Sequence, residues 1–189
     1  MFKRLAQLAA ILSVLLLLPA PAFSQGSLSD TFSGEELVES GREFFGSAAQ
    51  GLASVVERAV SQYGQPNGYI LGEEAGGALF VGAKYGEGTL YTRNAGQFKI
   101  FWQGPSIGLD VGGDGSKVMM LVYNLNTIQD ILGRYPGVDG SAYVIGGVGM
   151  TVTKRGNVVV VPIRSGVGAR LGINVGYLNF TAEPTWNPF

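Results

Sequence analysis

Histidine and cysteine are both absent from this chain of 189 residues. Without cysteine there is no disulfide, no thiolate zinc site, no iron–sulfur cluster and no thiol nucleophile. Without histidine there is no imidazole to serve as general base, metal ligand or member of a catalytic triad. The two absences exclude most hydrolase and metalloenzyme chemistries, so we expect no enzymatic activity, no cofactor and no metal.

Charge is also scarce. Charged residues make up 14% of the chain and the formal net charge is −1, so no basic surface is available for nucleic acid. Hydrophobic residues make up 46%, which is enough for a core and too much for a disordered chain. The length is that of one modest domain with an appendage.

Residues 1–24 have the order of a secretory signal peptide. Lys3 and Arg4 precede an apolar run of about 14 residues. The small residues that follow are typical of a signal-peptide cleavage site, with cleavage after Ala22 or Ser24. A membrane anchor is the alternative, but the run is short for a hydrocarbon core of ~30 Å. We expect a periplasmic protein without a transmembrane helix after cleavage; its mature chain has 11 basic and 14 acidic residues, a charge of −3.

Residues 25–67 are predicted to form a flexible leader and an amphipathic helical segment. Ser33 and Glu36 have the spacing of a capping box that starts a helix ending near Phe45. Residues 47–50 have the pattern of a second box. An apolar stripe with helical spacing follows, which we expect to pack on a sheet because its polar face is not rich in Lys and Arg. The stripe consists of Ala48, Leu52, Val55, Val56, Ala59, Val60 and Tyr63.

Residues 68–189 are predicted to form a glycine-rich strand domain, because apolar residues now alternate with a period of two. Alternation is found in residues 98–102, 107–111, 144–152 and 167–177. Residues 118–123 and 158–161 are apolar throughout and should be covered on both faces. We expect turns at residues 86–88 and 155–157. A short helix should begin at Asn126 or Thr127 and end by Tyr135.

Glycines recur at steps of four within these strands. They lie at Gly82 and Gly86, at Gly104, Gly108 and Gly112, and at Gly168, Gly172 and Gly176. Glycine weakens a strand, so its repetition indicates either sharp curvature of a small barrel or close approach of a ligand or another backbone. Curvature is the favoured interpretation. The predicted fold is mainly β: a small closed or nearly closed antiparallel β-barrel with an N-terminal helical segment and one short inserted helix.

Candidate site residues are few. Glu73 and Glu74 are adjacent and should project to opposite faces of a strand, which does not suit a catalytic pair. Ser165 has no base to activate it. Among the basic residues Arg170 is the best candidate for ligand binding, because its glycine neighbours leave room for a ligand; Arg164 and Lys84 are further candidates. Their predicted ligand is an anionic phospholipid or a cell-wall glycan.

Six ordered stretches carry a resemblance to a known family. They are residues 72–77, 101–106, 112–115, 138–143, 163–168 and 184–189. On these stretches the chain resembles the envelope integrity protein A family of exported bacterial proteins. The resemblance implies a periplasmic β-barrel that maintains the cell envelope, with no enzymatic activity. More distantly, residues 104–172 are similar to the SYLF domain, which implies phospholipid binding.

The sequence therefore predicts a non-enzymatic periplasmic β-barrel protein that supports cell-envelope integrity. The alternative is a binding module for an anionic phospholipid or a cell-wall glycan.

Export is directly testable. Osmotic shock should release a form that lacks residues 1–22 or 1–24, because the signal peptide is removed on translocation. Mass spectrometry of the released protein gives the cleavage site. Recovery of the uncleaved chain with washed membranes alone would contradict this prediction.

Overall fold

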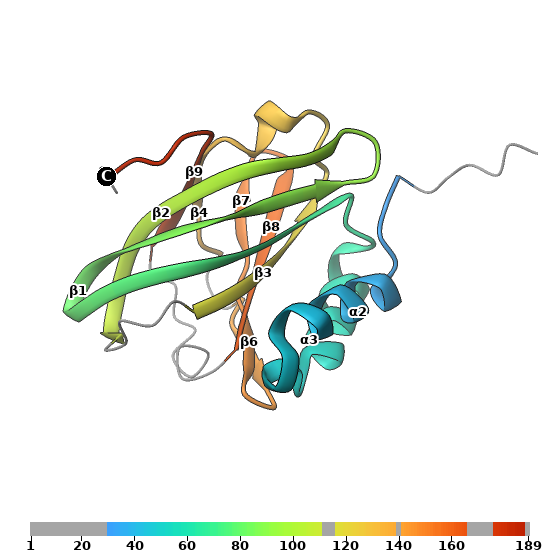
Figure 1. Cartoon of the computed structure of the whole chain (residues 1–189), viewed down its shortest axis with the longest axis horizontal. Helices are drawn as coiled ribbons and strands as arrows, with labels where there is room; N and C mark the ends of the chain where they lie inside the picture. The colour runs from blue at the N-terminus through green and yellow to red at the C-terminus, as the bar shows by residue number, and fades with distance from the viewer. Residues whose placement is uncertain (1–29, 111–115, 139–140, 166–175, 188–189) are drawn as a thin grey trace, which may run out of the picture.

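The computed structural model describes residues 30–110, 116–138, 141–165 and 176–187 (Figure 1). Among these residues two α-helices precede the strands, α2 (Gly34–Phe45) and α3 (Leu52–Tyr63), joined by the 3-10 helix η2 (Gly46–Ala49). A second 3-10 helix, η3 (Ile128–Ile131), lies among the strands. The strands are β1 (Gly68–Thr92), β2 (Gly96–Asp110), β3 (Ser116–Tyr123), β4 (Gly133–Pro136), β5 (Tyr143–Ile145), β6 (Val148–Met150), β7 (Thr153–Arg155), β8 (Val158–Ser165) and β9 (Tyr177–Thr181).

These strands form one curled antiparallel sheet. Its order is β4-β9-β2-β1-β3-β8-β6-β5, and β7 also pairs with β8. A bridge between Gly137 and Thr153 joins the end of β4 to β7, and the Val138 amide donates to the Val152 carbonyl at 2.8 Å beside it. The sheet thus returns on itself, which confirms the predicted small, nearly closed β-barrel.

The long strand β1 doubles back within its own length (Figure 1). Its first arm pairs with β3 and its second arm with β2. The arms meet at Gly72 and Gly88, where a Cβ on Gly72 would lie 2.2 Å from the Glu87 carbonyl oxygen and 2.7 Å from the Gly88 Cα. No side chain fits there, so at these positions glycine serves the close approach of two backbones.

The apolar core has two parts, one on each face of β3 and β8. The part inside the barrel contains Ile70, Leu90, Ile100, Trp102, Val118, Met120, Val122, Tyr135, Val160, Leu178 and Phe180. The outer part packs α2 and α3 on the sheet and contains Leu37, Leu52, Val55, Val56, Ala59, Met119, Leu121, Val161 and Ile163. Both apolar runs are therefore covered on both faces, as predicted.

The helical segment follows the sequence pattern in part. Ser33 and Glu36 form the predicted capping box of α2. The second predicted box is wrong: Gly51 precedes α3 and no side chain caps it, because η2 occupies the position expected for the first turn. Ala48 is consequently exposed, whereas the rest of the stripe is buried or half-buried.

One turn prediction and one strand prediction need correction. Residues 86–88 are not a turn but lie inside β1, and the turn to β2 falls at residues 93–95. Residues 144–152 are not one strand, because Gly146 and Gly147 have φ of 56° and 76° and make a tight turn between β5 and β6. Two successive residues with positive φ suit a two-residue hairpin, and here they interrupt a regular alternation.

The inserted helix is shorter than predicted. Thr127 caps it, but η3 ends at Ile131, and Tyr135 belongs to β4, where its side chain is buried in the barrel. The strand predicted over residues 167–177 lies almost entirely outside the described residues, because residues 166–175 are not described. Residues 112–115, one of the stretches that carry the family resemblance, also lie outside the described residues.

The glycine contact between the arms of β1 predicts a large effect of one methyl group. Gly72→Ala should lower the free energy of unfolding by about 1–3 kcal/mol, because the opposing atoms are backbone and cannot rotate away. Denaturant unfolding measures the effect. Gly34→Ala is the control: its nearest atom is Val60 Cγ2 at 4.0 Å, so it should be neutral or slightly stabilising. Equal stability of both variants would contradict the packing of the two arms.

Candidate functional site

A carboxylate is enclosed in the barrel wall. Glu74 of β1 receives two hydrogen bonds from the Arg164 guanidinium of β8, one from Nε to Oε1 and one from Nη2 to Oε2 at 3.1 Å. The indole Nε1 of Trp102 donates to Glu74 Oε2 at 3.2 Å. The side chains of Glu74 and Arg164 are 10% and 14% exposed. The pair is a bidentate, largely desolvated ion pair.

Strand register brings these groups together. Gly72, Val118 and Arg164 are aligned across β1, β3 and β8. Glu74 lies two residues along from Gly72 and so shares its face. Trp102 is the cross-strand partner of Gly86, whose missing side chain makes room for the indole. The cluster therefore depends on four strands, β1, β2, β3 and β8, and on the glycines at positions 72 and 86.

The charges around Glu74 determine its ionisation. Burial raises the pKa of the carboxyl, but the charge and hydrogen bonds of Arg164, the charge of Lys84 and the Trp102 hydrogen bond outweigh it and hold the pKa at about 2. Glu74 is thus an anion over the physiological range. It cannot act as a proton donor, and its lone pairs are directed at cations and the indole.

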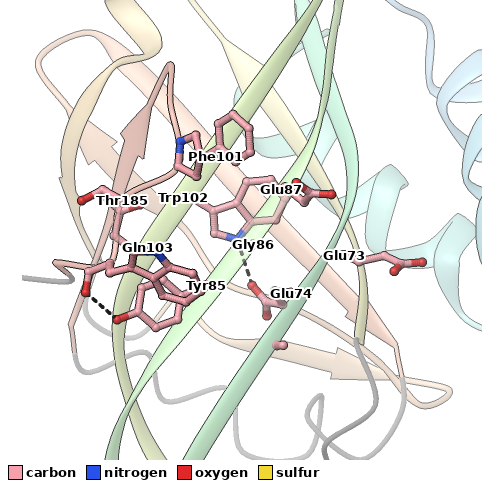
Figure 2. Close-up of a pocket in the computed structure, with 12 residues that line it drawn as sticks. Glu73, Glu74, Tyr85, Gly86, Glu87, Phe101, Trp102, Gln103 and Thr185 are labelled. Carbon is pink, nitrogen blue, oxygen red and sulfur yellow. Dashed lines mark hydrogen bonds between the residues drawn. The ribbon is translucent and has the colours of Figure 1, made fainter.

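An open groove of about 390 Å³ lies beside this ion pair (Figure 2). It is lined by Glu73, Glu74, Ala75, Tyr85, Gly86, Glu87, Phe101, Trp102, Gln103, Pro184, Thr185 and Trp186. Tyr85 Oη donates to the Trp186 carbonyl oxygen at 2.9 Å, and the two rings lie 5.7 Å apart. This contact ties the C-terminal segment to the wall of the barrel.

Two residues in this lining have unusual exposure. Trp186 is 87% exposed, although large aromatic side chains are normally covered. Gln103 is buried, at 1% exposed, and its Nε2 has no hydrogen-bond partner among the described residues. A buried donor without an acceptor costs about 1–3 kcal/mol, so the arrangement calls for an explanation.

The carboxylates of the groove differ in their surroundings. Glu73 and Glu74 extend from opposite sides of β1, as predicted from their adjacency (Figure 2). Glu87 is at the exposed rim and pairs with Lys99 at 3.2 Å. Neither Lys nor Arg is among the described lining residues. The lining is accordingly neutral to acidic.

Two of the three predicted ligand-binding residues meet at this place. Lys84 is buried on the returning arm of β1, and Arg164 reaches across the barrel wall; both act on Glu74. Arg170 lies outside the described residues. Ligand binding by the three stays a prediction. Sequence reasoning missed Tyr85, Gln103 and Trp186, because residues 85, 103 and 186 share no motif and are brought together only by the fold.

Over the described ranges no helix has the length and apolar character needed to cross a membrane. The same ranges hold no group of three or more acidic side chains placed to bind a metal ion.

The fold and the groove define a β-barrel-like protein with a ligand-sized groove on its wall. Residues 30–189 match the family described as envelope integrity protein A, and the chain belongs to this family. A solved structure, a β-barrel-like uncharacterized protein from Brucella abortus, is similar at 64% identity and a TM-score of 0.79. The likeness covers 85% of this chain and 100% of that one. No curated protein matches the chain.

The enclosed ion pair predicts a pH-dependent stability. The native pKa of Glu74, about 2, lies below the ordinary value of 4.5, so its contribution is complete above pH 4.5 and is lost as the pH falls toward 2. Glu74→Gln should destabilise by about 3 kcal/mol at pH 7, because Arg164 stays buried without its partner. The difference from the wild type should shrink by about 2 kcal/mol at pH 3.

Denaturant unfolding at the two pH values measures both quantities. The matched control is Glu73→Gln, which neutralises the exposed neighbour and should change stability little at either pH. A cost of Glu74→Gln that stays constant between pH 7 and pH 3 would contradict the ion pair.

Proposed function

We propose that this chain is an exported periplasmic protein that supports the integrity of the cell envelope by binding an envelope component, without catalysing a reaction. The observation that carries the proposal is membership of the envelope integrity protein A family over residues 30–189. Residues 1–24 supply the export signal that a periplasmic role requires.

The chemistry of the chain supports binding over catalysis. The sequence holds no imidazole and no thiol. The buried carboxylate, Glu74, is committed to Arg164 and Trp102 and stays ionised, so it is not poised near neutral pH as a general acid or base would be. A groove of about 390 Å³ with a few polar groups has the size and character of a small-molecule site.

Between the two predicted ligand types, the groove favours a glycan over an anionic phospholipid. Its described lining contains three glutamates and neither Lys nor Arg. The two described cations that the sequence suggested, Lys84 and Arg164, act on Glu74. An anionic headgroup would therefore meet no Lys or Arg side chain in the described lining, which disfavours its binding.

The proposed role has a cellular test. Deletion of the gene should sensitise cells to detergents and to cell-wall-directed antibiotics, measured as a lower minimal inhibitory concentration. The full chain should restore resistance, whereas a chain lacking residues 2–24 should not, because it stays in the cytoplasm. Wild-type resistance of the deletion strain, or full rescue by the chain without residues 2–24, would contradict the proposal.

A further inference from the structure

We infer that the hairpin between β5 and β6, together with η2, forms an uncharged apolar tip that inserts into the surface of a lipid bilayer. The tip consists of residues 46–51 and 144–147. None of these residues lines the groove, so the inference concerns a separate surface and goes beyond the proposed function.

Two neighbouring side chains of β5 are apolar and exposed. Val144 is 47% exposed and Ile145 is 38% exposed. Ile145 shares a face of the hairpin with its cross-strand partner Val148, which belongs to the outer core beneath the helices. Because successive side chains of a strand alternate, Val144 projects to the opposite face. The tip therefore presents apolar surface on both faces of the hairpin.

The hairpin lies at one end of the molecule, beside the start of α3 (Figure 1). A Cβ on Gly146 would lie 3.1 Å from the Gly51 Cα, so the hairpin and the segment that joins η2 to α3 are in contact. A Cβ on Gly147, by contrast, would have no heavy atom within 4 Å. The tip is thus a convex projection made of two adjoining loops.

This shape favours a lipid bilayer over a protein as the partner. A stable protein interface buries about 800 Å² on each partner, from about 20–30 residues, and the tip alone is much smaller. A second copy or another protein would cover one face of the hairpin and leave the other in water. Lipid is a fluid that surrounds a projection, so it can cover Val144 and Ile145 at the same time.

The tip carries no charge that insertion would have to desolvate. Residues 46–56 and 141–153 contain no Asp, Glu, Lys or Arg. β5 has 3 residues, which at about 3.3 Å each span about 10 Å. Interfacial elements are buried by about 5–10 Å, so the tip reaches the boundary of headgroups and acyl chains. Its backbone groups stay within reach of water and headgroups there.

Aromatic rings paired with cations stand beside the tip. The Arg58 guanidinium lies 4.9 Å from the centre of the Tyr143 ring. The Lys117 ammonium lies 5.1 Å from the centre of the Phe44 ring and donates to the Phe44 carbonyl oxygen at 2.7 Å. Tyrosine is enriched at membrane–water interfaces, and long cationic side chains keep their charge in the headgroup layer while their stems cover apolar surface.

Lipid charge contributes little to this contact. Glu57 precedes Arg58 on α3 and Glu43 precedes Phe44 on α2, and both glutamates are exposed. The surroundings of the tip are therefore of mixed sign, and no cationic face is present to select anionic headgroups. The apolar surface of the tip carries the binding, which should be weak, reversible and insensitive to salt.

The test is co-sedimentation of the mature protein with vesicles of phosphatidylcholine and with vesicles of phosphatidylethanolamine and phosphatidylglycerol. We expect binding to both, changed by less than about twofold between about 50 and 500 mM salt. The double variant Val144→Ser, Ile145→Ser should lower the partition coefficient about tenfold, because it removes the apolar area of the contact.

A gain-of-function variant separates membrane contact from folding. Val144→Trp should raise the partition coefficient about fivefold, because an indole favours the interface. A purely structural role of this position would not produce a gain, so this variant also decides the matter should the double variant fold poorly. The matched control is Val138→Ser, which truncates an apolar side chain that is 44% exposed outside the tip. It should bind like the wild type.

Four outcomes would overturn the inference. They are absence of binding to either kind of vesicle, binding to the anionic vesicles alone that salt abolishes, wild-type binding by the double variant, and loss of binding in Trp186→Ala in place of the tip variants. Analytical ultracentrifugation tests a second copy as the partner. A wild-type dimer that becomes monomeric in the double variant would assign the tip to self-association and so also overturn the inference.

Discussion

The contact between the two arms of β1 is the constraint on which the rest of the molecule depends. Gly72 and Gly88 allow one strand to double back and pair with β3 on one side and β2 on the other. This reversal joins the two halves of the sheet and places Lys84 near Glu74. Chain entropy opposes such a long-range arrangement, and burial of the apolar faces inside and outside the barrel offsets it.

The reversal of β1 also leads to the burial of a charged side chain, Glu74. Glu74 loses water on entering the barrel wall, and it is stable there as an anion because a guanidinium, an ammonium and an indole N–H replace the solvent. A pair of this kind contributes more to a unique arrangement of strands than to net stability. It fixes β8 against β1 and also holds the Trp102 indole over Gly86.

The groove departs from the packing rules that the core obeys. The core is made of closely packed aliphatic and aromatic side chains, whereas the groove combines a buried amide without an acceptor among the described residues and an indole almost fully in water. Both features cost stability in the free protein. Functional sites are the usual places where proteins retain such costs.

The sequence by itself determined the class of fold, because the change of apolar period from helical to strand-like and the two runs buried on both faces are local properties. It also determined the capping box of α2, the absence of imidazole and thiol chemistry, and the family. Only the tertiary structure decided where β1 turns, since residues 86–88 look like a turn until Trp102 is seen to lie on Gly86. It alone decided the site, because strand register and chain reversal bring Glu74, Arg164, Gln103 and Trp186 together from positions that share no sequence pattern.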